Sequence, residues 1–145
     1  MHNIHLGNHT DSLTLRIHGR IKPDSQSYWD ANWLHCSAEV SAGAFRGTLE
    51  WQLRNEDLAR FMDALERLGG LAGDALLDTL DGWLEVRVVR DERGHIEARC
   101  QLDDNARIRS TLEFGLPLDQ LAISALLSQL RAVLDWFPIV GKEGT

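Results

Sequence analysis

The sequence predicts an α+β fold, a two-layer sandwich in which two helices pack on one face of a curved antiparallel sheet of about six to seven strands. Most of the chain alternates between apolar and polar residues, which indicates strands that bury one face and expose the other. Two segments instead show a period near 3.6 residues, which indicates amphipathic helices able to cover the apolar face of the sheet. The predicted order is three strands, a helix, about four strands and a second helix, βββ-α-ββββ-α.

The first three predicted strands precede the first helix. Residues 13–17 alternate between apolar and polar side chains, and the polar residues 22–27 then predict a loop. Alternation returns in residues 34–40 and in residues 45–53. The turn residues 41–43 lie between these two segments, so we expect them to form a hairpin.

Both predicted helices have recognisable ends. The first begins at Asn55, whose side chain can cap free backbone amides, and ends at Gly69-Gly70, which supplies a left-handed exit. The second begins near Asp119, another capping residue, and ends before Pro138. The apolar stripes are Leu58, Phe61, Met62, Leu65 and Leu68 in the first helix, and Ile123, Leu126, Leu127, Leu130, Val133, Leu134 and Phe137 in the second.

The segment between the helices predicts the rest of the sheet. A short apolar stretch at 75–80 is followed by three alternating segments, 84–88, 96–102 and 108–114. Their connections are short and rich in turn residues. Because parallel strands need longer crossovers, we expect antiparallel hairpins.

Length and composition predict one folded domain. The chain has 145 residues, of which 43% are hydrophobic and 26% charged, as in ordinary globular proteins. We assign residues 1–145 to a single domain, with 1–12 as a mobile N-terminus and 141–145 as a tail. The start lacks the pattern of a secretory signal, and no apolar run is long enough to cross a bilayer. We therefore expect a soluble, cytoplasmic protein with no membrane partner.

The net charge of -7 bears on the kind of partner. A negative chain repels the phosphates of nucleic acids, so we expect no nucleic-acid partner. An acidic surface favours basic partners, although moderate negative charge is also a common route to solubility.

No residue pattern predicts a catalytic or metal site. His2, His5 and His9 cluster near the N-terminus, but no cysteine or carboxylate lies beside them at ligand spacing, so we expect neither metal nor cofactor. Cys36 and Cys100 share the inward phase of their strands, where burial makes a thiol a poor nucleophile.

The carboxylates also fit a structural role. Turns commonly collect aspartates, and no established catalytic motif surrounds them, so we expect no enzyme. A hydrolase with converging carboxylates stays as the least favoured alternative. The aspartates concerned are Asp74, Asp78, Asp81, Asp103 and Asp104.

The chain contains five tryptophans, and strand phase places only Trp51 clearly in the interior. Trp29, Trp33 and Trp83 lie before or at the start of predicted strands, and Trp136 lies off the apolar stripe of the second helix. Partly exposed tryptophans beside acids are typical of binding hot spots, whereas tryptophans at the ends of a sheet more often fill the rim of the core.

Several segments together carry a resemblance to a known family. They are Asp30-Ala31-Asn32-Trp33-Leu34, Asp57-Leu58 with Phe61 and Leu65, residues 71–80, Asp81-Gly82-Trp83-Leu84, Gly94-His95-Ile96, Leu112-Glu113-Phe114, Leu118-Asp119-Gln120 and Phe137-Pro138-Ile139-Val140-Gly141. Taken together, the chain resembles the WapI-type immunity proteins of bacterial polymorphic and contact-dependent toxin systems.

The resemblance implies a cytoplasmic protein that neutralises a cognate toxin domain by stoichiometric occlusion. We expect the toxin to contact Trp29, Trp33 and Trp83, with Asp78 and Asp81 supplying charge. Two alternatives stay open: a small-ligand-binding domain, or a structural adaptor that self-associates, for example as a homodimer.

Overall fold

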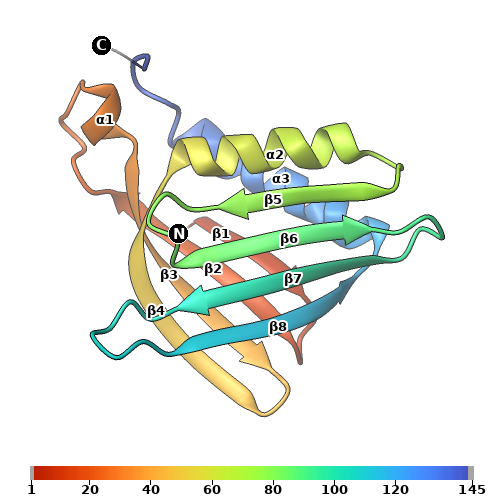
Figure 1. The fold of residues 1–145 in the computed structure, drawn as a ribbon. Helices are drawn as coiled ribbons and strands as arrows, with labels where there is room; N and C mark the ends of the chain where they lie inside the picture. The colour runs from red at the N-terminus through yellow and green to blue at the C-terminus, as the bar shows by residue number, and fades with distance from the viewer. Residues whose placement is uncertain (1, 144–145) are drawn as a thin grey trace.

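The computed structural model describes residues 2–143, and these form eight strands and three helices (Figure 1). The α+β class and both predicted long helices are confirmed. In chain order the elements are β1 (His2–Gly7), β2 (Ser12–Arg20), α1 (Tyr28–Ala31), β3 (Trp33–Ala42), β4 (Phe45–Arg54), α2 (Asn55–Leu68), β5 (Gly73–Asp78), β6 (Leu84–Arg90), β7 (Ile96–Asp103), β8 (Thr111–Leu118) and α3 (Gln120–Trp136).

The strands pair in sequence order to form two antiparallel sheets of four strands each, β1-β2-β3-β4 and β5-β6-β7-β8. Every pair joins strands that are consecutive in the chain, as the short connections predicted. The register of the β3–β4 hairpin places Cys36 opposite Trp51 and Val40 opposite Gly47. The apolar phases of neighbouring strands therefore lie on the same face of each sheet.

The prediction of one curved sheet with helices on one face is wrong, because the chain divides its strands between two sheets. The division falls at α2, whose 14 residues separate β4 from β5 and replace a hairpin turn. Alternation shows which face of a strand is apolar, but either a helix or a second sheet can cover that face. In this protein the buried residues of both sheets join a single core.

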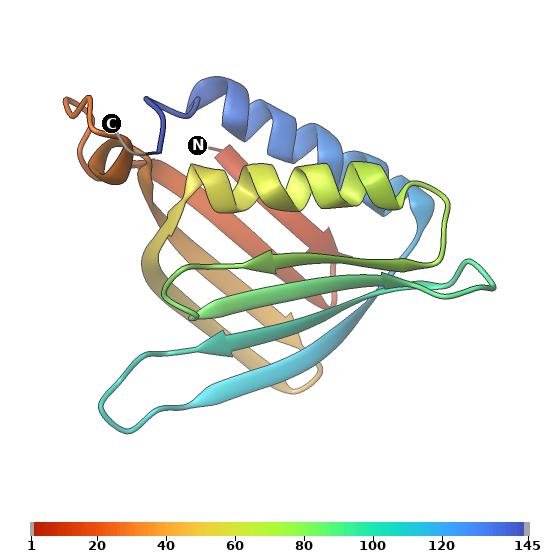
Figure 2. The same ribbon diagram turned by 45° about the horizontal axis from the view of Figure 1, so that its top comes forward.

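The two long helices close one side of the space between the sheets (Figure 2). The contacts of α2 are mainly with β5 and those of α3 mainly with β1, and the helices also contact each other. As predicted, Asp119 caps α3, because its Oδ1 accepts the Ala122 N–H at 2.8 Å. Gly69 ends α2 with a φ of 52°, in the left-handed region that favours glycine.

Asn55 does not cap α2, contrary to the prediction. The backbone N–H of Arg54 donates instead to the Asp57 side chain at 3.1 Å. The Asn55 amide is buried, and its Nδ2 donates to Asn32 Oδ1 at 3.2 Å and to the Phe137 carbonyl at 3.1 Å. This residue thus ties the start of α2 to the residue after α1 and to the end of α3.

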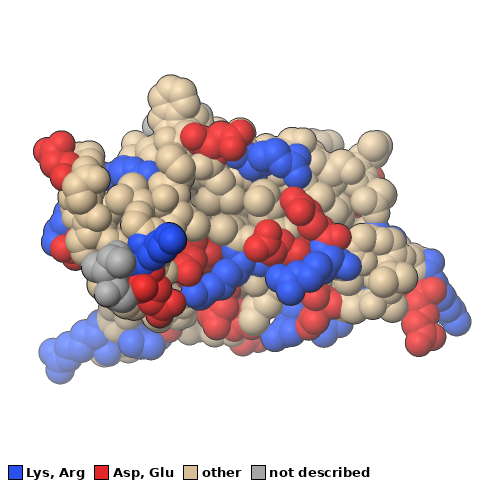
Figure 3. Space-filling model, turned by 90° about the horizontal axis from the view of Figure 1, so that it is seen from above, with Lys and Arg blue, Asp and Glu red and all other residues tan. Residues whose placement is uncertain are grey.

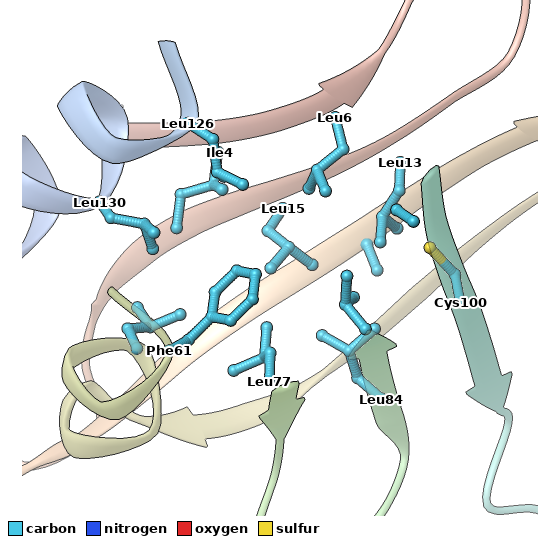
Figure 4. Packing of buried hydrophobic residues seen from close by; sticks show 14 of the residues in the cluster. Ile4, Leu6, Leu13, Leu15, Phe61, Leu77, Leu84, Cys100, Leu126 and Leu130 are labelled. Carbon is cyan, nitrogen blue, oxygen red and sulfur yellow. The ribbon is translucent and has the colours of Figure 1, made fainter. Parts of the chain in front are cut away.

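The core lies between the two sheets and beneath the helices (Figure 4). Phe61 of α2 is buried among side chains from both sheets, including Leu15 and Leu84. Leu126 and Leu130 add the apolar stripe of α3. Burying one large apolar side chain stabilises a fold by about 1.5–3 kcal/mol. Burial of the apolar side chains in this shared core is therefore the main contribution that holds the two sheets together.

Two elements were not predicted from the sequence, α1 and β1. Residues 2–7, within the segment predicted to be mobile, form β1, pair with β2 and bury Ile4 and Leu6. Gly7 lies at the end of β1, where the chain turns tightly toward β2. A side chain would not fit at this position, because a Cβ there would lie 2.2 Å from the carbonyl oxygen of Asp11.

The strand predicted at 108–114 begins later than expected. β8 starts at Thr111, and Ile108 lies in the preceding loop with its side chain exposed. The alternation of apolar and polar residues that begins at Ile108 therefore starts in a loop, where it does not indicate a strand. Of the helices that the structure describes, none combines the length and apolar character needed to cross a membrane.

The side opposite the helices is open. A groove of about 480 Å³ separates the first half of β4 from the β7–β8 hairpin. We call this groove the sheet opening. It is lined by Ala38, Val40, Phe45, Arg46, Gly47, Thr48, Leu49, Leu102, Asp104, Ser110, Thr111 and Leu112.

Candidate partner-binding surface

The short helix α1 presents Trp29 at the surface, where 49% of the residue is exposed. The Arg54 guanidinium lies over the Trp29 ring at 5.5 Å and over the Tyr28 ring at 5.2 Å. Both distances fall within the range of a cation–π contact. Trp33, which is half-buried, begins β3 opposite Arg54 in the register. Both tryptophans therefore lie close to Arg54.

Arg54 is itself held in place. It is buried, and its guanidinium forms an ion pair with Glu56 at 2.6 Å. The Tyr28 hydroxyl donates a hydrogen bond to the same carboxylate. Charge-assisted bonds of this kind fix geometry well, so Trp29 rests on a rigid support.

Trp51 lies on β4, and the prediction that it is interior is wrong. It is 40% exposed, and its Nε1 donates to Asp81 Oδ2 at 3.1 Å. The phase was correct, because Trp51 pairs with the buried Cys36. However, β4 is the last strand of its sheet, so its apolar face has less cover than that of an inner strand.

Trp83 lies in the core instead of at the surface where we expected a toxin contact. It is 2% exposed, and its Nε1 donates to the carbonyl of Gln52 in β4 at 2.8 Å. This bond holds the start of β6 against the outer edge of β4. Trp83 thus fills the rim of the core, the alternative that the sequence left open, and positions the neighbouring Asp81.

Asp78 and Asp81 are both exposed, at the end of β5 and in the turn that follows it. Asp78 lies opposite Glu85 in the register, so two carboxylates face each other across the strand pair. Among the described residues, Asp78, Asp81 and Glu50 form no ion pair. The turn and the end of β4 therefore carry uncompensated negative charge.

These residues lie at the second half of β4, with Trp33 opposite Arg54 on one face of the sheet and Trp51, which donates to Asp81, on the other, so that the two faces meet at the outer edge of β4. Trp33 and Gln52 line the same small pocket of about 210 Å³, and the Gln52 carbonyl holds the strand that follows Asp81. Sequence reasoning missed Trp51 here, although the helix that directly follows β4 could have marked it as an edge strand. We call this surface the tryptophan edge. It comprises Trp29, Trp33, Trp51, Asp78 and Asp81.

The helix side of the molecule carries a different charge pattern. Viewed from that side, basic and acidic side chains are interspersed (Figure 3). Arg60 pairs with Glu56 at 3.0 Å, and Arg131 of α3 pairs with Glu66 of α2 at 3.1 Å. Mixed and paired charges attract a charged partner less than uncompensated charges of one sign do, so the helix side is the weaker candidate.

Both cysteines are free and buried. Burial raises the pKa of both thiols, Cys36 and Cys100, to about 12, so neither forms a thiolate near neutral pH. No group of three histidine, cysteine or acidic side chains within residues 2–143 could hold a metal ion.

Another groove, of about 940 Å³, lies at the other end of the second sheet, along the β6–β7 turn and the end of β8. It contains His95, whose ring lies 3.3 Å from Asp91. The same carboxylate accepts the backbone N–H groups of Arg93 and His95, and these bonds, together with the His95 ring, lower its pKa. The pair therefore stabilises a turn, which explains its geometry without a ligand.

Comparison with known proteins identifies a family. The model of the family described as immunity protein WapI-like matches residues 4–138, which is most of the chain. A search of curated proteins finds no match.

Proposed function

The chain belongs to the WapI-like family of immunity proteins, and from this membership we infer that it neutralises a cognate bacterial toxin domain by binding it. The proposed mechanism is stoichiometric occlusion, in which a rigid surface covers the active or substrate-binding face of the toxin. Such a role needs no turnover and no cofactor. We place it in the cytoplasm of the producing cell, where the toxin would otherwise act.

We propose the tryptophan edge as the contact surface. Two exposed tryptophans support this choice: Trp29 packs against the buried Arg54, and Trp51 donates to Asp81, which forms no ion pair among the described residues. Large aromatic side chains at the centre of an interface slow dissociation, and uncompensated charge speeds the encounter with a basic partner. Trp83 supports this surface from within the core.

Co-expression tests the proposed function. Where the gene immediately upstream of this chain encodes a large secreted protein with a variable C-terminal domain, that domain is the probe. Cells that produce this domain should stop growing, and cells that also produce the chain should grow normally. Survival no better than with an empty plasmid would refute the immunity role.

A pair of tryptophan variants tests the proposed surface. Trp29→Ala removes an aromatic contact on the tryptophan edge, and we expect it to weaken binding of the toxin domain by about tenfold or more. Trp136→Ala is the matched control, because Trp136 is 68% exposed but belongs to α3. Equal losses in the two variants, measured by calorimetry, would place the interface elsewhere.

A further inference from the structure

The outer edge of β4 carries backbone groups that no described strand uses. In an antiparallel pair, alternate residues direct their N–H and C=O groups toward the neighbouring strand or away from it. Asn55 N–H donates to the Asn32 carbonyl at 3.0 Å. The backbone N–H and C=O groups of the odd-numbered residues of β4 therefore point toward β3. The bond from Trp83 to the Gln52 carbonyl agrees, because that carbonyl points away from β3. The free groups therefore belong to Arg46, Thr48 and Glu50.

The other sheet edges are covered or interrupted. β1 packs against α3 and β5 against α2, so neither edge is open to a new strand along its length. β8 contains Pro117, which has no N–H to donate, and it also contacts β1. β4 has ten residues and no proline. It is thus the edge best suited to accept another strand.

The apolar face of β4 would receive side chains from such a strand. Phe45 is 63% exposed although it shares the inward phase of the buried Leu53, and Leu49 between them is half-buried. All three lie on the side of β4 that faces the sheet opening or the core. The opening, of about 480 Å³, has room for side chains at alternate positions of an added strand.

The charges along the outer edge of β4 indicate the chemistry of a segment that would bind there. Glu50 directly precedes Trp51, whose indole donates to Asp81, and none of Glu50, Asp78 and Asp81 forms an ion pair among the described residues. Arg46 lies at the other end, where it bonds Ser41. A strand with basic residues at one end and alternating apolar residues along its length would complement both features.

We propose that an extended segment of the cognate toxin adds to β4 as a further strand of the first sheet. Its alternate apolar side chains enter the sheet opening, and its basic residues lie beside Glu50, Asp78 and Asp81. Backbone hydrogen bonds to Arg46, Thr48 and Glu50 supply affinity, and the opening supplies specificity. The proposal rests on the immunity function inferred above and adds the mode of binding.

One substitution removes the central edge donor without touching the β3–β4 pairing. Thr48→Pro deletes an N–H that points away from β3, and Gly47 before it accommodates the proline ring. Thr48→Val is the matched control, because it changes the side chain and keeps the N–H. The probe is the recombinant toxin domain used in the co-expression test, and its dissociation constant is measured by calorimetry with each variant.

We expect Thr48→Pro to weaken binding by about tenfold or more and Thr48→Val by less than about twofold. Equal affinity for the proline variant and the unaltered chain would overturn the added-strand mode while leaving the immunity function intact. No binding by the unaltered chain would instead refute the immunity function itself. The two failures are therefore distinguishable.

Amide exchange provides a second readout that needs no variant. In the free protein the amides of Arg46, Thr48 and Glu50 should exchange rapidly, and in the complex they should become protected by about tenfold or more. Unchanged exchange in a complex that forms would contradict the proposal. Protection that develops in the free chain as its concentration rises would identify a second copy of this chain as the occupant, and would also contradict it.

Discussion

The two sides of the sandwich are built from the same kind of strand but differ in what covers them. On the helix side, the apolar residues of the edge strands β1 and β5 are buried, as Ile4 and Leu77 show. On the open side, Phe45 has the same strand phase as its buried neighbours and is largely exposed. Apolar phase therefore marks where cover is needed, and the packing of the two long helices decides which strands receive it.

The largest expected effect comes from removing the cover on the helix side. Phe61→Ala should lower the free energy of unfolding by about 3–5 kcal/mol, because it empties a site buried between α2 and both sheets. Urea denaturation followed by circular dichroism measures the change. A loss below about 1 kcal/mol would mean that α2 contributes little to the core.

A smaller loss should follow from removing a buried polar contact on the same side. Asn32 Nδ2 donates to the carbonyls of Tyr28 and Val140 at 2.8 and 2.9 Å, and its Oδ1 accepts the Val140 N–H at 2.8 Å. Asn32→Ala should lower the free energy of unfolding by about 2 kcal/mol, since it leaves buried groups unpaired. Limited proteolysis should also cut the segment after α3 more rapidly in this variant, and an unchanged pattern would argue against the contact.

On the open side, we expect a substitution to weaken binding of the toxin domain without lowering the stability of the fold. Phe45→Ala should change the free energy of unfolding by less than about 0.5 kcal/mol, because the side chain is already exposed. It should nevertheless weaken toxin binding by about tenfold. The control is Leu121→Ala, which removes an exposed apolar side chain from α3. Comparable affinity in the two variants would show that the sheet opening is not part of the interface.

The smallest effect concerns charge. Asp81→Asn keeps an oxygen that can accept the Trp51 N–H and removes one negative charge. We expect the association rate with the toxin domain to fall about threefold at low salt, and the difference to shrink as salt screens the charge. Surface plasmon resonance at two ionic strengths measures this. Glu92→Gln, at the exposed β6–β7 turn, should leave the rate unchanged.

Much of the fold could be predicted from the sequence because periodicity reports local geometry. The boundaries of both long helices, the cap at Asp119 and the inward phase of Cys36 and Cys100 all follow from side-chain spacing. The division into two sheets could not be predicted, because alternation carries no information about which layer lies opposite. β1 was missed because its two buried residues, Ile4 and Leu6, are too few to establish a pattern.

The candidate surface was harder to predict than the fold. Exposure depends on neighbours that are distant in sequence, and the tryptophans illustrate this. Trp51 was predicted to be interior but is partly exposed because no strand lies beyond β4, whereas Trp83 was expected at the surface but is buried against Gln52. Only the arrangement of the strands in the assembled sheets shows that Trp51 is exposed and Trp83 is buried.

The burial of Trp83 also has a spectroscopic consequence. Among the five tryptophans, all within the described residues, it alone is buried, and it bridges the two sheets through Gln52. Its fluorescence should therefore resist quenching by acrylamide while the other four indoles respond. Loss of that resistant fraction during unfolding would report the moment at which the sheets separate, so the chain carries its own optical probe of sheet docking.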